Sequence, residues 1–299
     1  MVSGWIILDK PLGLGSTQAV AAVKRNLRAA GHGKVKVGHG GTLDPLATGV
    51  LPIALGEATK LAGRMLDASK VYLFTIRFGE ETDTLDAEGR VVASSDVRPA
   101  PADIAAILPR FTGPITQVPP AFSALKVEGK RAYDLARAGA EVVLASRDVS
   151  IHALDVVEAD ADSVTLRAHV SKGTYIRSLA RDIAHALGAV GHVTMLRRER
   201  AGPFSVAQAI SLDKLNEIGK GAALELILLP LEAGLDDIPA LDLNPEQARA
   251  VRQGRVLAGL PQDDGLYWAR AGASPVALMQ IDAGMAKVVR GFNLPDVAE

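Results

Sequence analysis

An α+β fold is compatible with three observations on this sequence. Residues 71–78 and 164–171 alternate between apolar and polar side chains with a period of two, which predicts β-strands. Residues 176–187 carry apolar side chains at helical spacing, which predicts an amphipathic helix. Past about residue 235, prolines and glycines separate short apolar runs, and this pattern predicts a small β-rich domain of about 60 residues.

The first elements are a strand and a helix. Residues 5–10 predict a short buried strand, which a proline ends. Ser16 or Thr17 is expected to cap a helix that ends at Gly31. The other face of this helix carries three cations: Lys24, Arg25 and Arg28.

Further helices are expected at residues 57–66 and 101–109. Residues 117–148 differ from these segments because they begin near two consecutive prolines and are rich in Lys and Arg. We therefore expect an excursion from the core, consisting of a loop followed by a short basic helix.

Length and composition indicate a globular protein. The chain has 299 residues, of which 48% are hydrophobic, so it can form a large core and a small second domain. The absence of cysteine excludes disulfides and cysteine-ligated metals and agrees with a reducing compartment. We see neither a signal peptide nor the roughly 20 apolar residues that a membrane span needs, and we expect a cytoplasmic protein.

The overall net charge of −1 hides an uneven distribution. Residues 1–60 contain seven basic and three acidic side chains, and residues 171–200 contain six and two, so each segment carries +4. Such a distribution can form a positive surface for phosphates on a neutral protein. An ordinary solvated surface is the alternative.

The most informative segment, residues 38–52, places the carboxylate of Asp44 in a turn. Pro45 disfavours the helical region for Asp44, and nearby glycines permit close approach of another backbone or a ligand. A catalytic acid on a rigid loop needs this setting. An aspartate that only stabilises the turn fits the spacing equally well.

The segment Gly-His-Gly-Gly-Thr-Leu-Asp-Pro-Leu-Ala-Thr-Gly-Val-Leu-Pro and its continuation to Lys60 resemble the first signature of the TruB family of bacterial tRNA pseudouridine-55 synthases. The resemblance implies that Asp44 is the essential catalytic residue and that His39 contacts RNA beside a flipped nucleotide. One position departs from the pattern, because Gly40 stands where many members have threonine. This substitution is expected to remove a side chain beside the site.

A second segment, Ser-Lys-Gly-Thr-Tyr-Ile-Arg at residues 171–177, contains a strand end, a glycine and the start of a helix. Taken alone, Arg177 could be a surface residue or could pair with a carboxylate from elsewhere. The segment also resembles the family's Gly-Thr-Tyr-Ile-Arg motif. This implies that Arg177 pairs with Asp44 and that Tyr175 lines a uridine pocket.

Three more residues match family positions. Tyr72 could be a core aromatic, but its Lys-x-Tyr context implies stacking on the target base. Leu196 resembles a pocket-lining leucine, and the adjacent Arg197 and Arg198 are expected to face phosphate. Lys10 matches a lysine near the site, where it would either support the loop or touch substrate.

The resemblance implies an α+β fold with a mixed, largely antiparallel sheet, and a reaction that converts uridine 55 in the T-loop of tRNA to pseudouridine. Residues 1–232 would form the catalytic domain, with residues 117–148 gripping the RNA arm, and residues 236–299 a small PUA-like domain. No metal or other cofactor is expected. We expect a monomer whose partner is the T arm of tRNA.

Two other functions remain open. The protein could be a tRNA chaperone that refolds the elbow region without catalysis, or a hydrolase that cleaves nucleosides with the same carboxylate. The sequence contains neither a nucleotide-binding P-loop nor a Gly-x-Ser-x-Gly nucleophile motif. His32 and His39 lie on a glycine-rich loop with no carboxylate cluster between them, which argues against a metal site.

Overall fold

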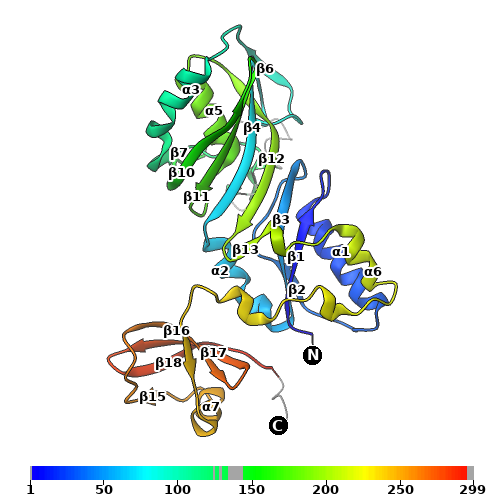
Figure 1. Cartoon of the computed structure of the whole chain (residues 1–299), viewed down its shortest axis with the longest axis vertical. Helices are drawn as coiled ribbons and strands as arrows, with labels where there is room; N and C mark the ends of the chain where they lie inside the picture. The colour runs from blue at the N-terminus through cyan, green and yellow to red at the C-terminus, as the bar shows by residue number, and fades with distance from the viewer. Residues whose placement is uncertain (1, 124, 128–129, 134–143, 295–299) are drawn as a thin grey trace. The chain divides into compact units, whose positions relative to one another are not determined.

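The computed structural model describes residues 2–123, 125–127, 130–133 and 144–294. The chain forms two compact units (Figure 1). Unit 1 comprises Met1–Leu43, Val50–Leu66 and Gly202–Glu299, and unit 2 comprises Asp44–Gly49 and Asp67–Ala201. The chain therefore passes from unit 1 to unit 2 between Leu43 and Asp44.

Unit 2 contains a largely antiparallel sheet. Its strands follow the order β12 (Gly191–Ala201), β4 (Lys70–Phe78), β11 (Ser163–Val170), β10 (Arg147–Ala159) and β7 (Gly113–Gln117). Neighbours in this list are antiparallel, whereas the first residues of β3 (Ala47–Leu55) run parallel to β12. The sheet is thus mixed and largely antiparallel, which confirms the predicted class.

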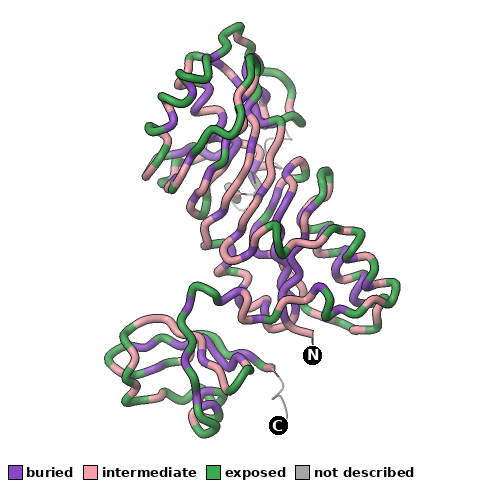
Figure 2. The backbone as a smooth tube through the Cα atoms, in the orientation of Figure 1, coloured by how far each residue is buried: buried purple, intermediate pink, exposed green. Residues whose placement is uncertain are grey.

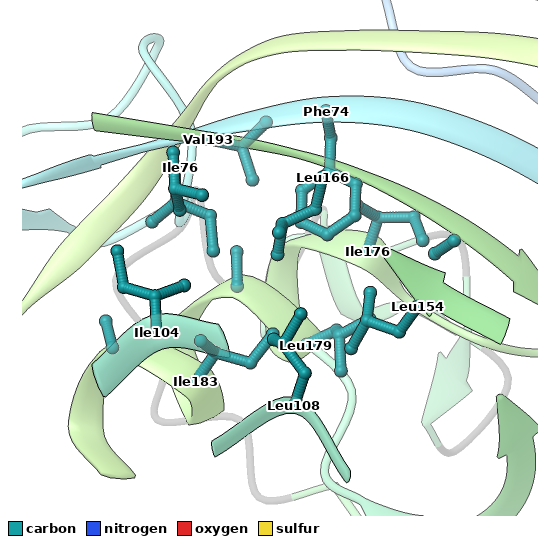
Figure 3. Packing of buried hydrophobic residues seen from close by; sticks show 14 of the residues in the cluster. Phe74, Ile76, Ile104, Leu108, Leu154, Leu166, Ile176, Leu179, Ile183 and Val193 are labelled. Atoms are coloured by element: carbon teal, nitrogen blue, oxygen red, sulfur yellow. The ribbon is translucent and has the colours of Figure 1, made fainter. Parts of the chain in front are cut away.

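Two helices cover one face of this sheet: α3 (Pro101–Ile107) and α5 (Ile176–Ala186) (Figure 1). The alternating residues Phe74, Ile76 and Phe78 of β4 are buried against them, as the period of two predicts. Figure 3 shows Ile104 of α3 and Leu179 of α5 in the same apolar cluster. This packing fixes α5 firmly against the sheet.

The remaining elements of unit 2 are short. A β5–β6 hairpin (Glu80–Thr82 and Val91–Ser94) precedes α3, the 3₁₀ helix η2 (Leu108–Phe111) follows α3, and β8 (Lys126–Val127) pairs with β9 (Lys130–Arg131). The predicted helix at 101–109 therefore ends two residues early. Residues 124, 128–129 and 134–143 of the predicted excursion at 117–148 lie outside the described residues, so the expected basic helix stays a prediction.

Unit 1 contains a buried strand near the N-terminus. The strand β1 (Gly4–Lys10) is buried along its length, as predicted, and β2 (Val37–His39) pairs with the end of β3. The helices of this part are α1 (Ser16–Ala29), η1 (Gly56–Leu61), α2 (Ala62–Asp67) and α6 (Leu212–Ile218). Segment 57–66 is therefore half 3₁₀ helix and half α-helix rather than one α-helix.

The prediction that Ser16 or Thr17 is the N-cap residue of α1 was wrong. Gly15 is the N-cap residue, and its N–H donates to Oε1 of Gln18 at 2.8 Å. The hydroxyl of Ser16 is instead used in a contact with Leu43, which is described below.

The C-terminal part of unit 1 is β-rich, as predicted. Its sheet has the order β14 (Ala240–Asp242), β16 (Gly265–Ala271), β17 (Ser274–Asp282), β18 (Met285–Gly291) and β15 (Leu257–Ala258). The helix α7 (Pro245–Arg252) buries Ala248 and Val251 in the same cluster as this sheet. Figure 2 shows the buried positions of each part. None of the described helices is both long and apolar enough to cross a membrane.

Candidate active site

The backbone on both sides of Asp44 is fixed. The Ser16 hydroxyl donates to the carbonyl of the preceding Leu43 and accepts its N–H, each at 2.9 Å. On the other side, the N–H of Ala47 donates to the Asp44 carbonyl at 3.0 Å and closes a turn around Pro45. The carboxylate of Asp44 therefore projects from a constrained loop.

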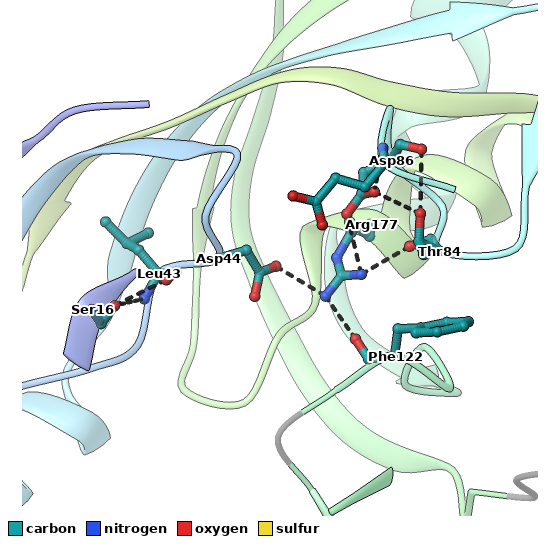
Figure 4. Close-up of polar contacts among 8 residues, drawn as sticks. Ser16, Leu43, Asp44, Thr84, Asp86, Phe122 and Arg177 are labelled. Carbon is teal, nitrogen blue, oxygen red and sulfur yellow. Dashed lines mark hydrogen bonds and ion pairs between the residues drawn. The ribbon is translucent and has the colours of Figure 1, made fainter. Parts of the chain in front are cut away.

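Arg177 pairs with this carboxylate, as the resemblance implies. Its Nη2 lies 2.9 Å from Oδ2 of Asp44 (Figure 4). The Arg177 side chain is 8% exposed, whereas that of Asp44 is 44% exposed. The ion pair therefore joins a buried cation to a carboxylate that solvent or substrate can reach.

The guanidinium of Arg177 is held by three further groups. Nη1 donates to the Thr84 carbonyl at 2.8 Å, and Nη2 donates to the Phe122 carbonyl at 3.0 Å (Figure 4). Oδ2 of Asp86 lies 3.3 Å from Nη1. Because the guanidinium is planar and presents its donors in a fixed fork, these contacts leave it little freedom to rotate.

Asp86 is the residue of this site that the sequence did not single out. Its Oδ1 accepts the Thr84 hydroxyl at 2.6 Å and the N–H of Glu88 at 3.1 Å. The preceding Leu85 has a φ of 63°, an uncommon conformation for a branched residue, and its carbonyl accepts the N–H of Val193. In the sequence, Asp86 is one of five acidic residues within positions 80–88, and residue type alone does not distinguish it from the others.

A small pocket surrounds the pair. Its lining comes from the Asp44 loop, Asp86, α5 and β12: Asp44, Leu46, Ala47, Asp86, Arg177, Val193, Thr194, Met195 and Leu196. Leu196 lies on β12 in register with Ala47 of β3 and Phe74 of β4. The structure thus brings together Asp44, Arg177 and Leu196 among the predicted residues.

Strands β3 and β12 approach each other closely just beyond the residues that line the pocket. Gly49 has a φ of +100°, and a Cβ there would lie 2.2 Å from the Arg198 carbonyl, so only glycine fits. Arg198 itself is 1% exposed. The expectation that Arg198 faces phosphate was therefore wrong. Arg197 is half-buried, and its contact with phosphate stays a prediction.

Tyr72 lies on β4 directly opposite Arg198 of β12 and Ala168 of β11. It is half-buried and packs against the edge of the apolar cluster. Its role in stacking stays a prediction.

Tyr175 is the N-cap residue of α5, and the Arg147 guanidinium lies 5.4 Å from the centre of its ring. It is not among the residues that line the pocket. Its predicted contact with uridine stays a prediction.

Lys10 and His39 belong to unit 1. Lys10 is fully buried, and its Nζ donates to the carbonyls of Pro11 at 3.1 Å and Leu14 at 2.6 Å. This geometry favours the loop-supporting alternative for Lys10. His39 is the last residue of β2, opposite Ile53 of β3, and is half-buried.

Gly40 is tightly packed rather than surrounded by space. A Cβ at this position would lie 2.5 Å from Cβ of Met65 and 3.0 Å from its Cγ. The expectation that Gly40 merely removes a side chain was therefore incomplete, because Met65 occupies the space.

The Lys70 ammonium has an unusual environment. Burial, with the cations Arg198 and Lys172 nearby, lowers the pKa of Lys70 to about 8, and Asp67 opposes this effect. Nζ donates to the Ala68 carbonyl at 2.6 Å.

Within the described ranges, no group of three or more His, Asp and Glu side chains could hold a metal ion.

Comparison with known proteins gives consistent matches. The family described as "TruB family pseudouridylate synthase (N terminal domain)" matches residues 24–176, and "tRNA pseudouridylate synthase B C-terminal domain" matches residues 177–236. The chain is 73% identical to a tRNA pseudouridine synthase B of Novosphingobium aromaticivorans, covering 100% of both chains. It is 58% identical to one of Zymomonas mobilis, covering 97% of this chain and 96% of the other.

A solved structure is also similar over most of the chain. It is described as an H/ACA RNP bound to a substrate RNA containing 2'-deoxyuridine, and it aligns with a TM-score of 0.74 at 26% identity. The alignment covers 98% of this chain and 86% of that one.

Proposed function

The chain belongs to the TruB family of pseudouridylate synthases, and from this premise we propose that it converts uridine 55 in the T-loop of tRNA to pseudouridine. The reaction breaks the N1–C1′ bond, rotates the uracil and joins C5 to C1′. The proton at C5 leaves and N1 gains one, so the composition of the RNA does not change.

We propose Asp44 as the catalytic carboxylate. The observation that carries this proposal is the ion pair between exposed Asp44 and buried Arg177, because it fixes a carboxylate in a pocket without covering it. The carboxylate would act either by attack at C1′ or by removal of the C2′ proton. A primary isotope effect with uridine deuterated at C2′ supports removal of the proton, and its absence supports attack at C1′.

The substrate must leave the folded T-loop to reach this pocket, which costs about a few kcal/mol. Stacking on Tyr72 and apolar contact with Leu196 would offset part of this cost. His39 and Tyr175 complete the proposed substrate contacts, Lys10 supports the loop, and Arg177 orients Asp44. Shape and loop nucleotides would dominate recognition of the RNA.

We further propose the organisation of the whole protein. Residues 1–232 form the catalytic domain, residues 117–148 grip the T arm, and residues 236–299 form a PUA-like domain. The enzyme acts as a cytoplasmic monomer and requires no metal or other cofactor.

The test uses unmodified tRNA labelled with tritium at C5 of uridine. We expect the wild-type protein to release tritium and to place one pseudouridine at position 55. Asp44→Asn is expected to abolish release while tRNA still binds. Asp148→Asn is the matched control, since Asp148 is exposed and bonds only to Thr116 among the contacts described.

The outcomes separate the alternatives. No release by the wild-type protein from a tRNA with an intact T arm contradicts the proposed function. Release by Asp44→Asn at the wild-type rate leaves a synthase but refutes the role of Asp44. Free uracil in place of pseudouridine identifies a hydrolase, and refolding of tRNA without conversion identifies a chaperone.

A further inference from the structure

One amide side chain of the sheet is hydrogen-bonded to the N-cap residue of the helix that carries Arg177. Gln117, the last residue of β7, is 1% exposed. Its Oε1 accepts the N–H of Tyr175 at 2.8 Å, and its Nε2 donates to the carbonyl of the same residue at 3.1 Å. The side chain thus satisfies both backbone polar groups of one residue, as a neighbouring strand would.

Tyr175 is the point at which α5 begins. It is the N-cap residue, and no side chain caps the helix there. Its carbonyl also accepts the N–H of Leu179 at 3.0 Å, which is a bond of the first helical turn. Gln117 therefore fixes the residue from which the direction and register of α5 follow.

Arg177 lies two residues further along and must reach Asp44. A displacement of the helix start would move the guanidinium away from Asp44 and from the Thr84 carbonyl together. Gln117 does not line the pocket, so it can influence the reaction only through the residues whose positions it fixes, which are Tyr175 and, through the helix start, Arg177. A misplacement of about 1 Å at a reacting group can cost about 100-fold in rate.

We infer that Gln117 is a positioning residue for the Asp44–Arg177 pair, an inference that rests on the proposed function. Glutamine suits this position because it carries one acceptor and two donors on a single planar group. Asparagine is one methylene shorter and cannot reach both groups from the same backbone. Methionine has a similar volume but forms neither hydrogen bond.

The test is a double-mutant cycle on kcat for tritium release, with Gln117→Met and Arg177→Lys as the two changes. We expect Gln117→Met to lower kcat by about 10- to 100-fold and to leave the tRNA Kd within about 2-fold. In the Arg177→Lys background the same change is expected to alter kcat by less than about 2-fold, because Gln117 acts through Arg177.

The matched control is Ser178→Ala. The Ser178 hydroxyl donates to the Val118 carbonyl at 2.8 Å, so this change also removes a hydrogen bond between the end of β7 and α5, but away from Tyr175. We expect kcat to stay within about 2-fold of the wild-type value. A loss equal to that of Gln117→Met would show a general structural role and overturn the inference.

Other outcomes are equally decisive. If the wild-type protein is active and folded Gln117→Met has an unchanged kcat, the positioning role is refuted but the proposed function stands. An equal loss of kcat in the wild-type and Arg177→Lys backgrounds also refutes only the positioning role. An inactive wild-type protein contradicts the proposed function instead. If Gln117→Met does not fold cooperatively, Gln117→Asn replaces it in the same cycle, with the same criteria.

Discussion

Asp44 and Asp86 contact opposite nitrogens of one guanidinium, that of Arg177. The two carboxylates differ in environment, since the Asp44 side chain is 44% exposed and that of Asp86 is 11% exposed. Asp86 also accepts two hydrogen bonds from its own segment, whereas Asp44 projects into the pocket. Asp86 thus anchors Arg177, and the carboxylate of Asp44 is available to a substrate.

We expect Asp86→Asn to lower kcat by about 10- to 100-fold, because a neutral group holds the Nη1 side of Arg177 less firmly. The free energy of unfolding should fall by about 1–3 kcal/mol, since a hydrogen bond to a buried charged group is weakened. Tritium release and urea unfolding measure these two effects. The tRNA Kd is expected to stay unchanged, because the side chain of Asp86 is directed at Arg177.

Asp83→Asn provides the control. Asp83 lies in the same segment but pairs with exposed Arg90 at 3.8 Å. Its replacement should leave kcat at the wild-type value. Equal losses in the two variants would contradict the assignment of Asp86 as the anchor of Arg177.

Gly40 and Met65 should be energetically coupled. We expect Gly40→Thr to lower the free energy of unfolding by about 1–3 kcal/mol, because the added Cβ would overlap with Cβ of Met65. The same change in a Met65→Gly background should cost less than about 0.5 kcal/mol, since the overlapping atom is absent. Urea unfolding of the wild type, the two single variants and the double variant gives the coupling energy between positions 40 and 65.

Gly38→Thr is the control for this cycle, because no atom lies within 4 Å of a Cβ placed at Gly38. It should be tolerated in both backgrounds. A cost for Gly40→Thr that does not depend on Met65 would show that the steric explanation is wrong.

The sequence predicted the parts of this fold whose signals are local. The alternation in β4, the helical spacing in α5 and the glycine-rich turn at Asp44 each depend on a few neighbouring residues. The partnership of Asp44 with Arg177 is different, because 133 positions separate the two residues in the chain. It followed from the family resemblance and not from the spacing of residues.

The features that the sequence could not reveal depend on tertiary contacts. Ser16 has the residue type of a helix cap, but its hydroxyl is used by Leu43, which is distant in sequence. Arg198 has the residue type of a phosphate ligand, but β12 directs it into the interior. The roles of Asp86 and Gln117 likewise depend on which segments the sheet brings to α5.

We expect the cations of α1 to contribute to RNA binding through contacts with phosphates. In the part of the chain that the structure describes, no ion pair involves Lys24, Arg25 or Arg28. We expect Arg25→Gln to weaken tRNA binding and to reduce the slope of log K against log salt by about 1, because one fewer counterion is released. Titrations at several salt concentrations measure this slope.

Lys214→Gln removes the same charge from an exposed position of α6, where Lys214 already pairs with Glu217 at 2.7 Å. It should leave the slope unchanged. Identical slopes for wild type and Arg25→Gln would exclude a phosphate contact by Arg25. Neither change should affect kcat at saturating tRNA.

The low pKa of Lys70 predicts that the protein becomes more stable at alkaline pH. Below about pH 8, Lys70 is charged in both the folded and the unfolded chain, and the folded state bears the full cost of burying the charge. Between about pH 8 and 10.5 the unfolded chain binds more protons, so the free energy of unfolding rises with pH. The difference between the ordinary lysine pKa of 10.5 and the folded-state pKa of about 8 corresponds to at most about 3–4 kcal/mol.

Lys70→Met should remove this rise, because it has no ammonium to deprotonate, and should therefore narrow the difference in unfolding free energy between pH 7 and pH 9.5. Urea unfolding at these two values measures the difference for each protein. Lys172→Met is the control, since the Lys172 side chain is 64% exposed and pairs with Asp67 in solvent, and it should keep most of the wild-type rise. The same rise in Lys70→Met and in wild type would show that another group is responsible.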